Sequence, residues 1–389
     1  MIIERYYMKI VVAIDSFKGS LTSVEAGLAA KAGILKAIPH ACVTVCPIAD
    51  GGEGTVDAVI EGLNATLRRV SVCGPLGKSV CAYYGITSDN IAVMEMAKAS
   101  GLTLIDAEER NPMYTTTYGV GEMIRDAISA GCREFIIGIG GSATNDGGIG
   151  MLQALGFSFL DKDGKEVPYG AYGVSLISSV CTDGAMKELK ECKFHIACDV
   201  TNPLCGKNGC SFVYARQKGA DDEMIEKMDT YLEKYAEITE KTLSISTKNA
   251  EGAGAAGGLG FAFISYLNAS LEKGISLIIE KTSLEEKIKD ADFVVTGEGR
   301  LDGQTAMGKA PIGVSEIASK YSVPVIAFAG SVTDDAKKCN ERGITSFFPI
   351  LREICTLETA LKPEYARKNM TDTAEQVFRL LQINPKECR

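Results

Sequence analysis

The sequence predicts an α/β protein built from parallel strand–helix–strand units, and three observations support this fold class. Apolar strand patterns alternate with helical patterns along the whole chain. Nearly every strand pattern runs directly into glycine or an acidic residue. The chain has 389 residues, of which 46% are hydrophobic and 23% charged, so it is long enough for two domains with complete cores.

The helices and strands can be placed from periodicity and end signals. The predicted strands lie at residues 9–15, 43–49, 133–140, 193–200, 292–297, 323–330 and 346–350. The helix after the first strand begins at a capping box of Thr22 and Glu25, and its predicted core stripe is Val24, Leu28, Ala32 and Leu35. A longer amphipathic helix is predicted from Asp222 to Leu243, with a packing face of Met224, Met228, Leu232 and Tyr235.

The two ends of the chain are similar in style, whereas the middle has an α/β pattern of its own. We therefore predict a discontinuous domain, residues 1–74 and 285–389, with a second domain, residues 75–284, inserted into it. Ligands of open α/β sheets bind outside the carboxyl ends of the strands, so we expect the site in an interdomain cleft lined by these loops. Residues 1–7 precede the first strand pattern, and we interpret them as a ragged extension.

The net charge and the cysteine pattern limit which classes of binding partner and which cellular compartment are expected. A net charge of -9 argues against a broad electrostatic surface for nucleic acid or anionic membranes, so a small molecule is the expected partner. The 13 cysteines are scattered without CxxC pairs, and only two histidines are present, which favours reduced thiols over disulfides or a zinc site. With neither a signal peptide nor a long apolar run, we expect a cytoplasmic protein.

Glycine-rich loops after strands suggest anion binding. The loop after residues 133–140 reads GIGGSATNDGG, and its glycines let backbone N–H groups approach an anion closely. The first strand is followed by DSFKGSL, in which Lys18 can meet a phosphate or carboxylate as a point charge. The second is followed by DGGEGT, with Asp50 and Glu53 among glycines, which suits a metal-bound phosphate or a polyol.

Three short patterns resemble nucleotide motifs but fit them poorly. GIGGSA at 138–143 has the spacing of a dinucleotide-binding turn, yet TNDGG follows where the helix should already have begun. GAGAAG at 252–257 follows a polar segment rather than a strand. GQTAMGKA at 303–310 has P-loop spacing, but Ala310 stands where that motif needs a hydroxyl; Lys309 near a helix start can still contact a phosphate.

Acidic residues lie at the ends of two further predicted strands. The strand at 193–200 presents Asp199 at its tip with Asn202 nearby, and we interpret His195 within it as a structural residue. The segment VTGEGRLDGQT presents Glu298 and Arg300 just past a buried strand, a mixture suited to phosphate and metal.

Anion cradles, separate lysines, loop carboxylates and few histidines together favour phosphoryl transfer, in which positioning and charge neutralisation do most of the work. A serine or cysteine hydrolase is less well supported, because the chain has no G-x-S-x-G elbow. Two other classes stay open: an NAD-dependent hydroxy-acid dehydrogenase, and a non-catalytic sensor of a nucleotide or sugar acid.

Six motifs, in order, resemble those of the bacterial glycerate kinase family of the first type: DSFKGSL, IADGGEGT, GIGGSATNDGG, ACDVTNPLCG, GAGAAGGLG and TGEGRLDGQTAMGKAP. The resemblance covers nearly the whole chain from Met8, with Ile14 standing where the family often has proline. It implies transfer of the ATP γ-phosphate to D-glycerate, giving 2-phosphoglycerate, with 3-phosphoglycerate as the alternative product. It also implies two α/β domains, the discontinuous one Rossmann-like with restriction-enzyme-like topology and the inserted one flavodoxin-like, with a homodimer as one candidate assembly.

The resemblance implies a role for individual residues. Asp199 is the expected base for the glycerate hydroxyl, Asp50 is its rival, and Lys18 neutralises the transferring phosphate or the substrate carboxylate. Arg300 is expected to hold the glycerate carboxylate, and the other expected substrate-binding residues are Asp15, Ser16 and Asn202. The expected ligands of the nucleotide phosphates are Gly140, Gly141, Ser142, Asn145, Gly254, Gly257 and Lys309. Asp146 and Glu298 are expected to hold Mg²⁺ directly or through water.

Overall fold

The computed structural model describes residues 7–48, 60, 65–274 and 283–383. These residues form two compact units. The discontinuous unit comprises residues 7–48, 60 and 283–383, and the inserted unit comprises residues 65–274. Each unit is an α/β structure with its own sheet, so the predicted α/β class is confirmed, although the sheet of the inserted unit is mixed and not wholly parallel.

The discontinuous unit is built on a five-stranded parallel sheet in the order β13-β12-β11-β1-β2. Numbered within the unit, this is the 2-1-3-4-5 order of flavodoxin-like folds. We expected a Rossmann-like fold in this unit and a flavodoxin-like fold in the inserted unit. The flavodoxin-like strand order is found in the discontinuous unit instead. The strands are β1 (Lys9–Ile14), β2 (Cys42–Val45), β11 (Phe293–Leu301), β12 (Val325–Val332) and β13 (Ser346–Pro349). The helices are α1 (Ser23–Ala37), α11 (Leu284–Lys289), η5 (Thr305–Met307), α12 (Ala310–Lys320), η6 (Asp334–Arg342), α13 (Leu357–Leu361) and α14 (Pro363–Leu381).

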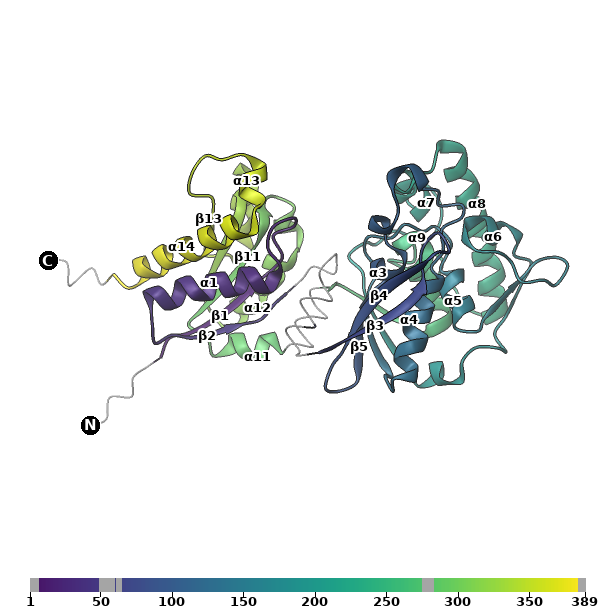
Figure 1. The fold of residues 1–389 in the computed structure, drawn as a ribbon, viewed down its shortest axis with the longest axis horizontal. Coiled ribbons are helices and arrows are strands. Elements are labelled where there is room, and N and C mark those ends of the chain that lie inside the picture. The colour runs from purple at the N-terminus through teal and green to yellow at the C-terminus, as the bar shows by residue number, and fades with distance from the viewer. Residues whose placement is uncertain (1–6, 49–59, 61–64, 275–282, 384–389) are drawn as a thin grey trace. The chain divides into compact units, whose positions relative to one another are not determined.

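Helix α1 begins as predicted but buries a different face. The capping box of Thr22 and Glu25 is present. The predicted stripe is wrong, because Leu28 is 53% exposed and the buried face consists largely of alanine and glycine. Figure 1 shows α14 lying beside α1, and a Cβ atom at Gly33 would lie 2.1 Å from the carbonyl oxygen of Thr371. Small residues let the two helix backbones approach closely, which a stripe of large residues would prevent.

The inserted unit contains a six-stranded mixed sheet in the order β10-β9-β6-β5-β4-β3. Its strands are β3 (Thr66–Cys73), β4 (Ser79–Ile86), β5 (Ile91–Glu95), β6 (Glu134–Gly138), β9 (Lys193–Ala197) and β10 (Ser270–Glu272), with a separate pair β7 (Ser158–Leu160) and β8 (Ser179–Cys181). Because β3 pairs antiparallel with β4, residues 66–73 belong to this unit and not to the discontinuous one, where the sequence placed them. The order is sequential rather than flavodoxin-like.

The helices of the inserted unit are α3 (Ala97–Ser100), η1 (Leu102–Leu104), η2 (Ala107–Glu109), α4 (Tyr118–Ser129), α5 (Ile149–Ala154), α6 (Gly170–Leu176), η3 (Lys187–Glu191), α7 (Cys210–Tyr214), η4 (Arg216–Lys218), α8 (Asp222–Leu243) and α9 (Ala255–Leu267). The bounds of α8 agree with the prediction, and Met228, Leu232 and Tyr235 are buried. Asp221 caps this helix, since its side chain accepts the N–H of Met224.

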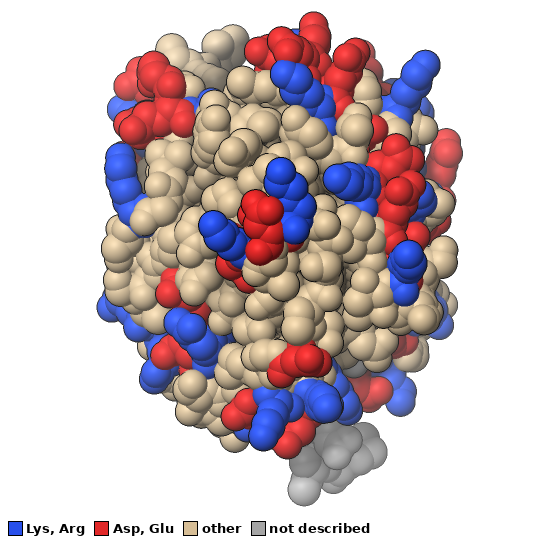
Figure 2. All heavy atoms as spheres, turned by 90° about the vertical axis from the view of Figure 1, so that its right-hand side faces the viewer, with Lys and Arg blue, Asp and Glu red and all other residues tan. Residues whose placement is uncertain are grey.

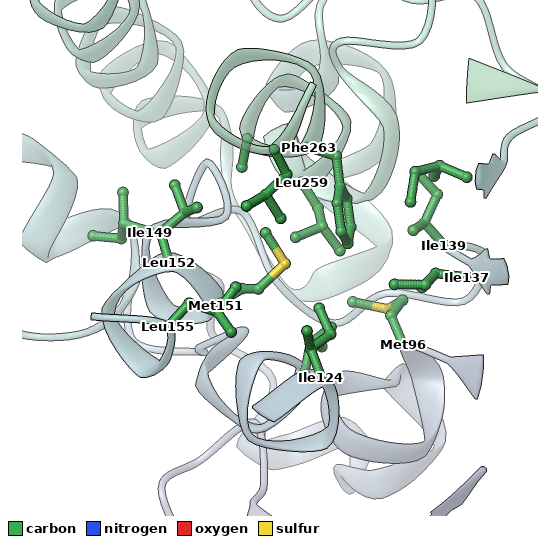
Figure 3. Close-up of a cluster of buried hydrophobic side chains, with 14 of the residues drawn as sticks. Met96, Ile124, Ile137, Ile139, Ile149, Met151, Leu152, Leu155, Leu259 and Phe263 are labelled. Carbon is green, nitrogen blue, oxygen red and sulfur yellow. The ribbon is translucent and has the colours of Figure 1, made fainter. Parts of the chain in front are cut away.

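The core of the inserted unit fixes both ends of its glycine-rich loop. Figure 3 shows Met151 of α5 pointing toward Leu259 and Phe263 of α9, with Ile124 of α4 below it. Ile139 and Ile149, which bracket residues 140–148, belong to the same buried cluster. A loop anchored at both ends in packed side chains holds one conformation.

The surface mixes charges of both signs. On the face drawn in Figure 2, Lys and Arg side chains are interspersed with Asp and Glu, and uncharged residues cover much of the area between them. In the part of the chain that the structure describes, no helix combines the length and the apolar character needed to cross a bilayer.

Candidate active site

A cavity of 390 Å³ opens at the carboxyl ends of β1 and β11 in the discontinuous unit. In this strand order β2 lies on one side of β1, and the next strand of the sheet along the chain, β11, lies on its other side. The direction in which strands are added to the sheet therefore reverses at β1. That reversal is the place where open α/β sheets bind ligands. Asp15 and Lys18 line the cavity from the loop after β1, and Glu298 and Arg300 line it from the end of β11.

The loop after β1 forms a tight turn with Lys18 at its tip. The N–H of Ser20 donates to the carbonyl of Phe17 at 2.7 Å, and Gly19 has a φ of +77°, as position three of a type II turn requires. Asp15 is buried at the strand end, where its Oδ1 accepts the N–H of Ser16 at 2.6 Å. The turn therefore exposes a cation beside a buried carboxylate.

Glu298 is buried between a hydroxyl and a cation. It is 7% exposed, and its Oε1 accepts a hydrogen bond from the hydroxyl of Thr305. The Nζ of Lys309 lies 4.0 Å from its Oε2. Lys309 is the N-cap residue of α12, so the expectation of a lysine at a helix start is confirmed. A carboxylate and an ammonium at a helix start can hold a metal ion and a phosphate respectively.

Arg300 stands at the rim of the cavity. Its side chain is 65% exposed, and its Nε lies 3.5 Å from the Oδ2 of Asp302. Asp302 itself folds the turn that follows, since its Oδ1 accepts the N–H groups of Gln304 and Thr305. A guanidinium on such an exposed side chain can bind a carboxylate in bidentate fashion.

Sequence reasoning missed the opposite wall of the cavity. Leu351, Leu357 and Leu361 make this wall apolar, and Asn369 of α14 lies beside them. Asn369 is 5% exposed, and its Nδ2 has no hydrogen-bond partner among the described residues. A buried amide without a partner is costly unless a ligand satisfies it. The available signal was a polar residue between Ala366 and Met370 on the buried face of an amphipathic helix.

The inserted unit carries a row of backbone donors after β6. In the described chain, the N–H groups of Gly140, Gly141 and Ser142 have no hydrogen-bond acceptor. Gly140 and Gly141 are exposed, and Gly141 has a φ of +71°. Successive N–H groups around a left-handed residue form a concavity that binds anions. We name residues 140–142 the amide nest.

Asp199 lies at the same edge of the sheet as the amide nest. Gly138 of β6 is paired with Ala197 of β9, so Gly140 and Asp199 each follow two residues beyond this pair. Adjacent strands are about 4.8 Å apart. Asp199 is exposed, and its Oδ1 accepts the N–H of Gly274 at 3.2 Å. The structure thus brings the expected base beside the expected phosphate loop.

Asp146, an expected metal ligand, has a structural role instead. It is fully buried, its Oδ2 accepts the N–H and hydroxyl of Thr117 at 2.8 Å, and its Oδ1 accepts the N–H of Gly148 at 3.1 Å. Burial raises the pKa of this carboxyl despite these donors. Both oxygens hold the loop and the start of α5, which argues against direct coordination of a metal.

The second glycine loop packs against the first instead of cradling a phosphate. Gly254 is buried and its N–H donates to the carbonyl of Asn202 at 2.9 Å. A Cβ atom at Gly257 would lie 2.1 Å from the carbonyl oxygen of Thr144, and Gly257 has a φ of +69°. Both glycines are therefore needed for close backbone packing, and their expected role in phosphate binding is not supported.

Two amide side chains that we expected at the site, those of Asn145 and Asn202, form hydrogen bonds within the protein instead. Asn145 is fully buried and its Nδ2 donates to the hydroxyl of Ser211 at 2.9 Å. The Nδ2 of Asn202 donates to the carbonyl of Asn208 at 2.8 Å, and its Oδ1 accepts the hydroxyl of Tyr214 at 2.7 Å. These contacts favour structural roles over contact with a phosphate or the substrate.

Three charged residues near the amide nest were not anticipated. Glu95 ends β5, the neighbour of β6, and lies 3.7 Å from Lys98 at the start of α3. The strand IAVME before them has the same strand-then-acid pattern as the other loops but is short. Lys218 is fully buried beneath the loop, and nothing in its local sequence distinguishes it from a surface lysine.

The remaining expectations concern His195, Asp50 and the metal ligands. His195 lies between two carboxylates of neighbouring strands, with Nδ1 3.1 Å from Glu272 and Nε2 3.4 Å from Glu134, as a structural histidine does. Asp50 lies outside the described residues. Within the described ranges, no cluster of three or more histidine, cysteine or acidic side chains could hold a metal ion.

The geometry does not support a dinucleotide site. After β6 the next helix, α5, begins only at Ile149, whereas a Rossmann turn leads directly into its helix. The inserted unit has an amide nest at a strand end, and the discontinuous unit has a lysine-bearing turn and carboxylates at the strand ends of its parallel sheet. Each set of groups is typical of enzymes that handle phosphates.

Comparisons with known proteins identify the family. The model of the glycerate kinase family matches residues 10–382. The chain is 46% identical to glycerate 2-kinase of Escherichia coli K12, over 92% of this chain and 94% of that one. It is 44% identical to glycerate kinase of Bacillus subtilis 168, over 95% and 97%. A crystal structure from Salmonella typhimurium LT2 that carries the name glycerate kinase 2 superposes with a TM-score of 0.90, at 45% identity, covering 97% and 98%. The chain therefore belongs to the glycerate kinase family and is an enzyme.

Proposed function

We propose that this enzyme transfers the γ-phosphate of ATP to the 2-hydroxyl of D-glycerate. Family membership supports the reaction class, and the name of the relative from Escherichia coli supports the 2-hydroxyl as acceptor. The observation that carries the proposal is the amide nest of Gly140–Ser142 with Asp199 in register beside it. Fixed N–H donors at a strand end suit the phosphates, and a neighbouring carboxylate suits the proton of the acceptor hydroxyl.

Each unit has groups that suit part of this chemistry. In the discontinuous unit, Arg300 and Lys18 line the cavity and can bind the glycerate carboxylate or a phosphate. Lys309 at the start of α12 can neutralise a further phosphate oxygen. In the inserted unit, the nest holds nucleotide phosphates through backbone donors. Asp199 accepts the hydroxyl proton as the oxygen attacks, and Asp50 is the rival for this role.

Mg²⁺ fits this chemistry through few protein ligands. The ion is usually held by one or two carboxylates together with substrate phosphates and water, so a preformed cage is not required. Glu298, buried at the cavity with Thr305 and Lys309 on its oxygens, is the carboxylate we assign to it. Bound there, the ion would offset negative charge on the transferring group.

Phosphorus NMR of the product formed from D-glycerate, ATP and Mg²⁺ tests the proposal. We expect the signal of 2-phosphoglycerate, whereas 3-phosphoglycerate would reassign the acceptor hydroxyl. Absence of any phosphoglycerate would reject the activity.

The variant Asp199→Asn tests the base. We expect kcat to fall about 10²- to 10⁴-fold with unchanged ATP affinity, because general base catalysis typically contributes that much. Asp183→Asn, which changes an exposed carboxylate of the same unit, is the matched control. Near-normal turnover of Asp199→Asn would transfer the role to another group, Asp50 first.

A further inference from the structure

A lysine is buried under the glycine-rich loop of the inserted unit. Lys218 ends η4 and is 2% exposed. Its Nζ donates to the hydroxyl of Ser142 at 2.8 Å and to the carbonyl of Thr144 at 2.7 Å. Lysine is rarely buried to this extent, because the ammonium loses its hydration. A charge kept at such a place needs an explanation.

The surroundings of Lys218 compensate only part of that cost. The residues that interact with its charge are Asp146 of the same loop and Cys210 at the start of α7. Burial raises the pKa of the Cys210 thiol to about 12, so this group remains neutral. Burial also lowers the pKa of Lys218 to about 8. Scaffold stability alone would be served as well by an apolar side chain of similar volume.

Both hydrogen bonds of Lys218 end on the loop that carries the backbone donors. Ser142 is the third residue of the amide nest, and Thr144 follows two residues later. The hydrogen bond to Ser142 fixes the side chain of the last residue of the amide nest. The bond to Thr144 fixes a carbonyl against the packed backbone of Gly257. The lysine thus sets the curvature of the loop and places a positive charge beneath it.

We propose that Lys218 is a positioning residue for nucleotide phosphates: its ammonium holds the loop of residues 140–144 in the anion-binding conformation and adds positive potential behind the amide nest. The proposal rests on the proposed function, since it takes ATP phosphates as the anion. A fixed cation behind fixed backbone dipoles strengthens binding of an anion without reorganisation. It also explains why an ammonium stands where an apolar residue would suffice for packing.

Binding of a non-hydrolysable ATP analogue, measured by calorimetry on the full chain between pH 7 and 9.5, tests the proposal. For the wild type, affinity should fall as the pH rises through about 8, because the ammonium loses its proton there. Lys218→Met keeps the length and apolar stem of the side chain. It should bind about 10-fold more weakly at pH 7 and lose the pH dependence, with the KM for D-glycerate unchanged.

Two controls separate folding from charge. Lys234→Met removes an exposed lysine of α8 and should leave affinity and its pH dependence unchanged. Ser142→Ala removes one contact but keeps the ammonium, so it should weaken binding less and keep the pH dependence. If Lys218→Met does not fold, the wild-type pH profile and Ser142→Ala still decide. Equal affinity and equal pH dependence of wild type and Lys218→Met would overturn the proposal.

Hydrogen exchange distinguishes this failure from failure of the proposed function. The analogue should protect the amides of Gly140 and Gly141 in the wild type. If it binds without protecting them, the nest is not the phosphate site, and the roles of both the nest and Lys218 are rejected, whereas the activity itself is decided by the NMR experiment. If it protects them equally well in Lys218→Met, only the role of Lys218 is rejected.

Discussion

The Nζ of Lys309 lies 4.0 Å from the Oε2 of Glu298, and the hydroxyl of Thr305 donates to the other oxygen of the same carboxylate. We assign Glu298 to Mg²⁺, so its charge should set the requirement for the metal. Glu298→Gln should raise the Mg²⁺ concentration for half-maximal activity about 10- to 100-fold, because the amide is a weaker ligand for a hard cation. Activity measured as a function of Mg²⁺ checks this, with the exposed Glu286→Gln as control. An unchanged Mg²⁺ requirement would remove Glu298 from the metal site.

Replacement of Asn369 should move stability and activity in opposite directions. Its Nδ2 is buried without a partner among the described residues, so Asn369→Leu should leave the melting temperature unchanged or raise it. If the amide binds a substrate oxygen in the cavity, the KM for D-glycerate should rise about 10-fold. Thermal unfolding and steady-state kinetics of the same preparation measure both. A lower melting temperature with normal KM would make Asn369 a purely structural residue.

The packing of the two glycine loops can be tested with a matched pair of substitutions. Gly257→Ala meets both a left-handed backbone and the carbonyl of Thr144, and it should cost about 2–5 kcal/mol of unfolding free energy. Gly164 has a similar φ of +75° with nothing near its Cβ position, so Gly164→Ala should cost only about 1–2 kcal/mol. Denaturant unfolding measures both. Equal losses would mean that the loops separate easily.

Burial of Lys218 predicts how stability depends on pH. Its pKa falls from the ordinary 10.5 to about 8 in the folded chain, so between these values the unfolded chain binds the extra proton. The unfolding free energy of the wild type, relative to Lys218→Met, should therefore rise as the pH increases from 8 to 10.5. The rise should be about 3 kcal/mol at most. Melting temperatures of both proteins across this range give the comparison, and a difference that falls with pH would contradict it.

Periodicity and end signals were sufficient for much of the fold. The bounds of α8 and the capping box of α1 follow from local patterns, because amphipathic spacing and side-chain caps are properties of a short segment. The buried face of α1 could not be predicted in the same way. It depends on the close approach of α14, which lies more than three hundred residues further along the chain.

The residues of the candidate site likewise fall into those that local patterns could predict and those that depend on distant contacts. Strand ends followed by glycine or acid predicted that Gly140 and Asp199 lie at the same sheet edge, because neighbouring parallel strands have their carboxyl ends together. The same pattern predicted Glu298 at a strand of the other unit's sheet. Local pattern could not tell an open loop from a buried one. Asp146 and Gly257 look like ligand residues in the sequence, yet both hold neighbouring backbone. The role of Lys218 depends on a contact across 76 residues, which no local window contains.

The discontinuous unit has a consequence for biosynthesis. Strand β1 leaves the ribosome long before one of its two partner strands, because β11 is made some 280 residues later. At about 5–20 residues per second, the wait is roughly 15–60 seconds. The inserted unit is complete by then, so during translation it should fold first, while the edge of β1 that later pairs with β11 stays open and needs protection from aggregation.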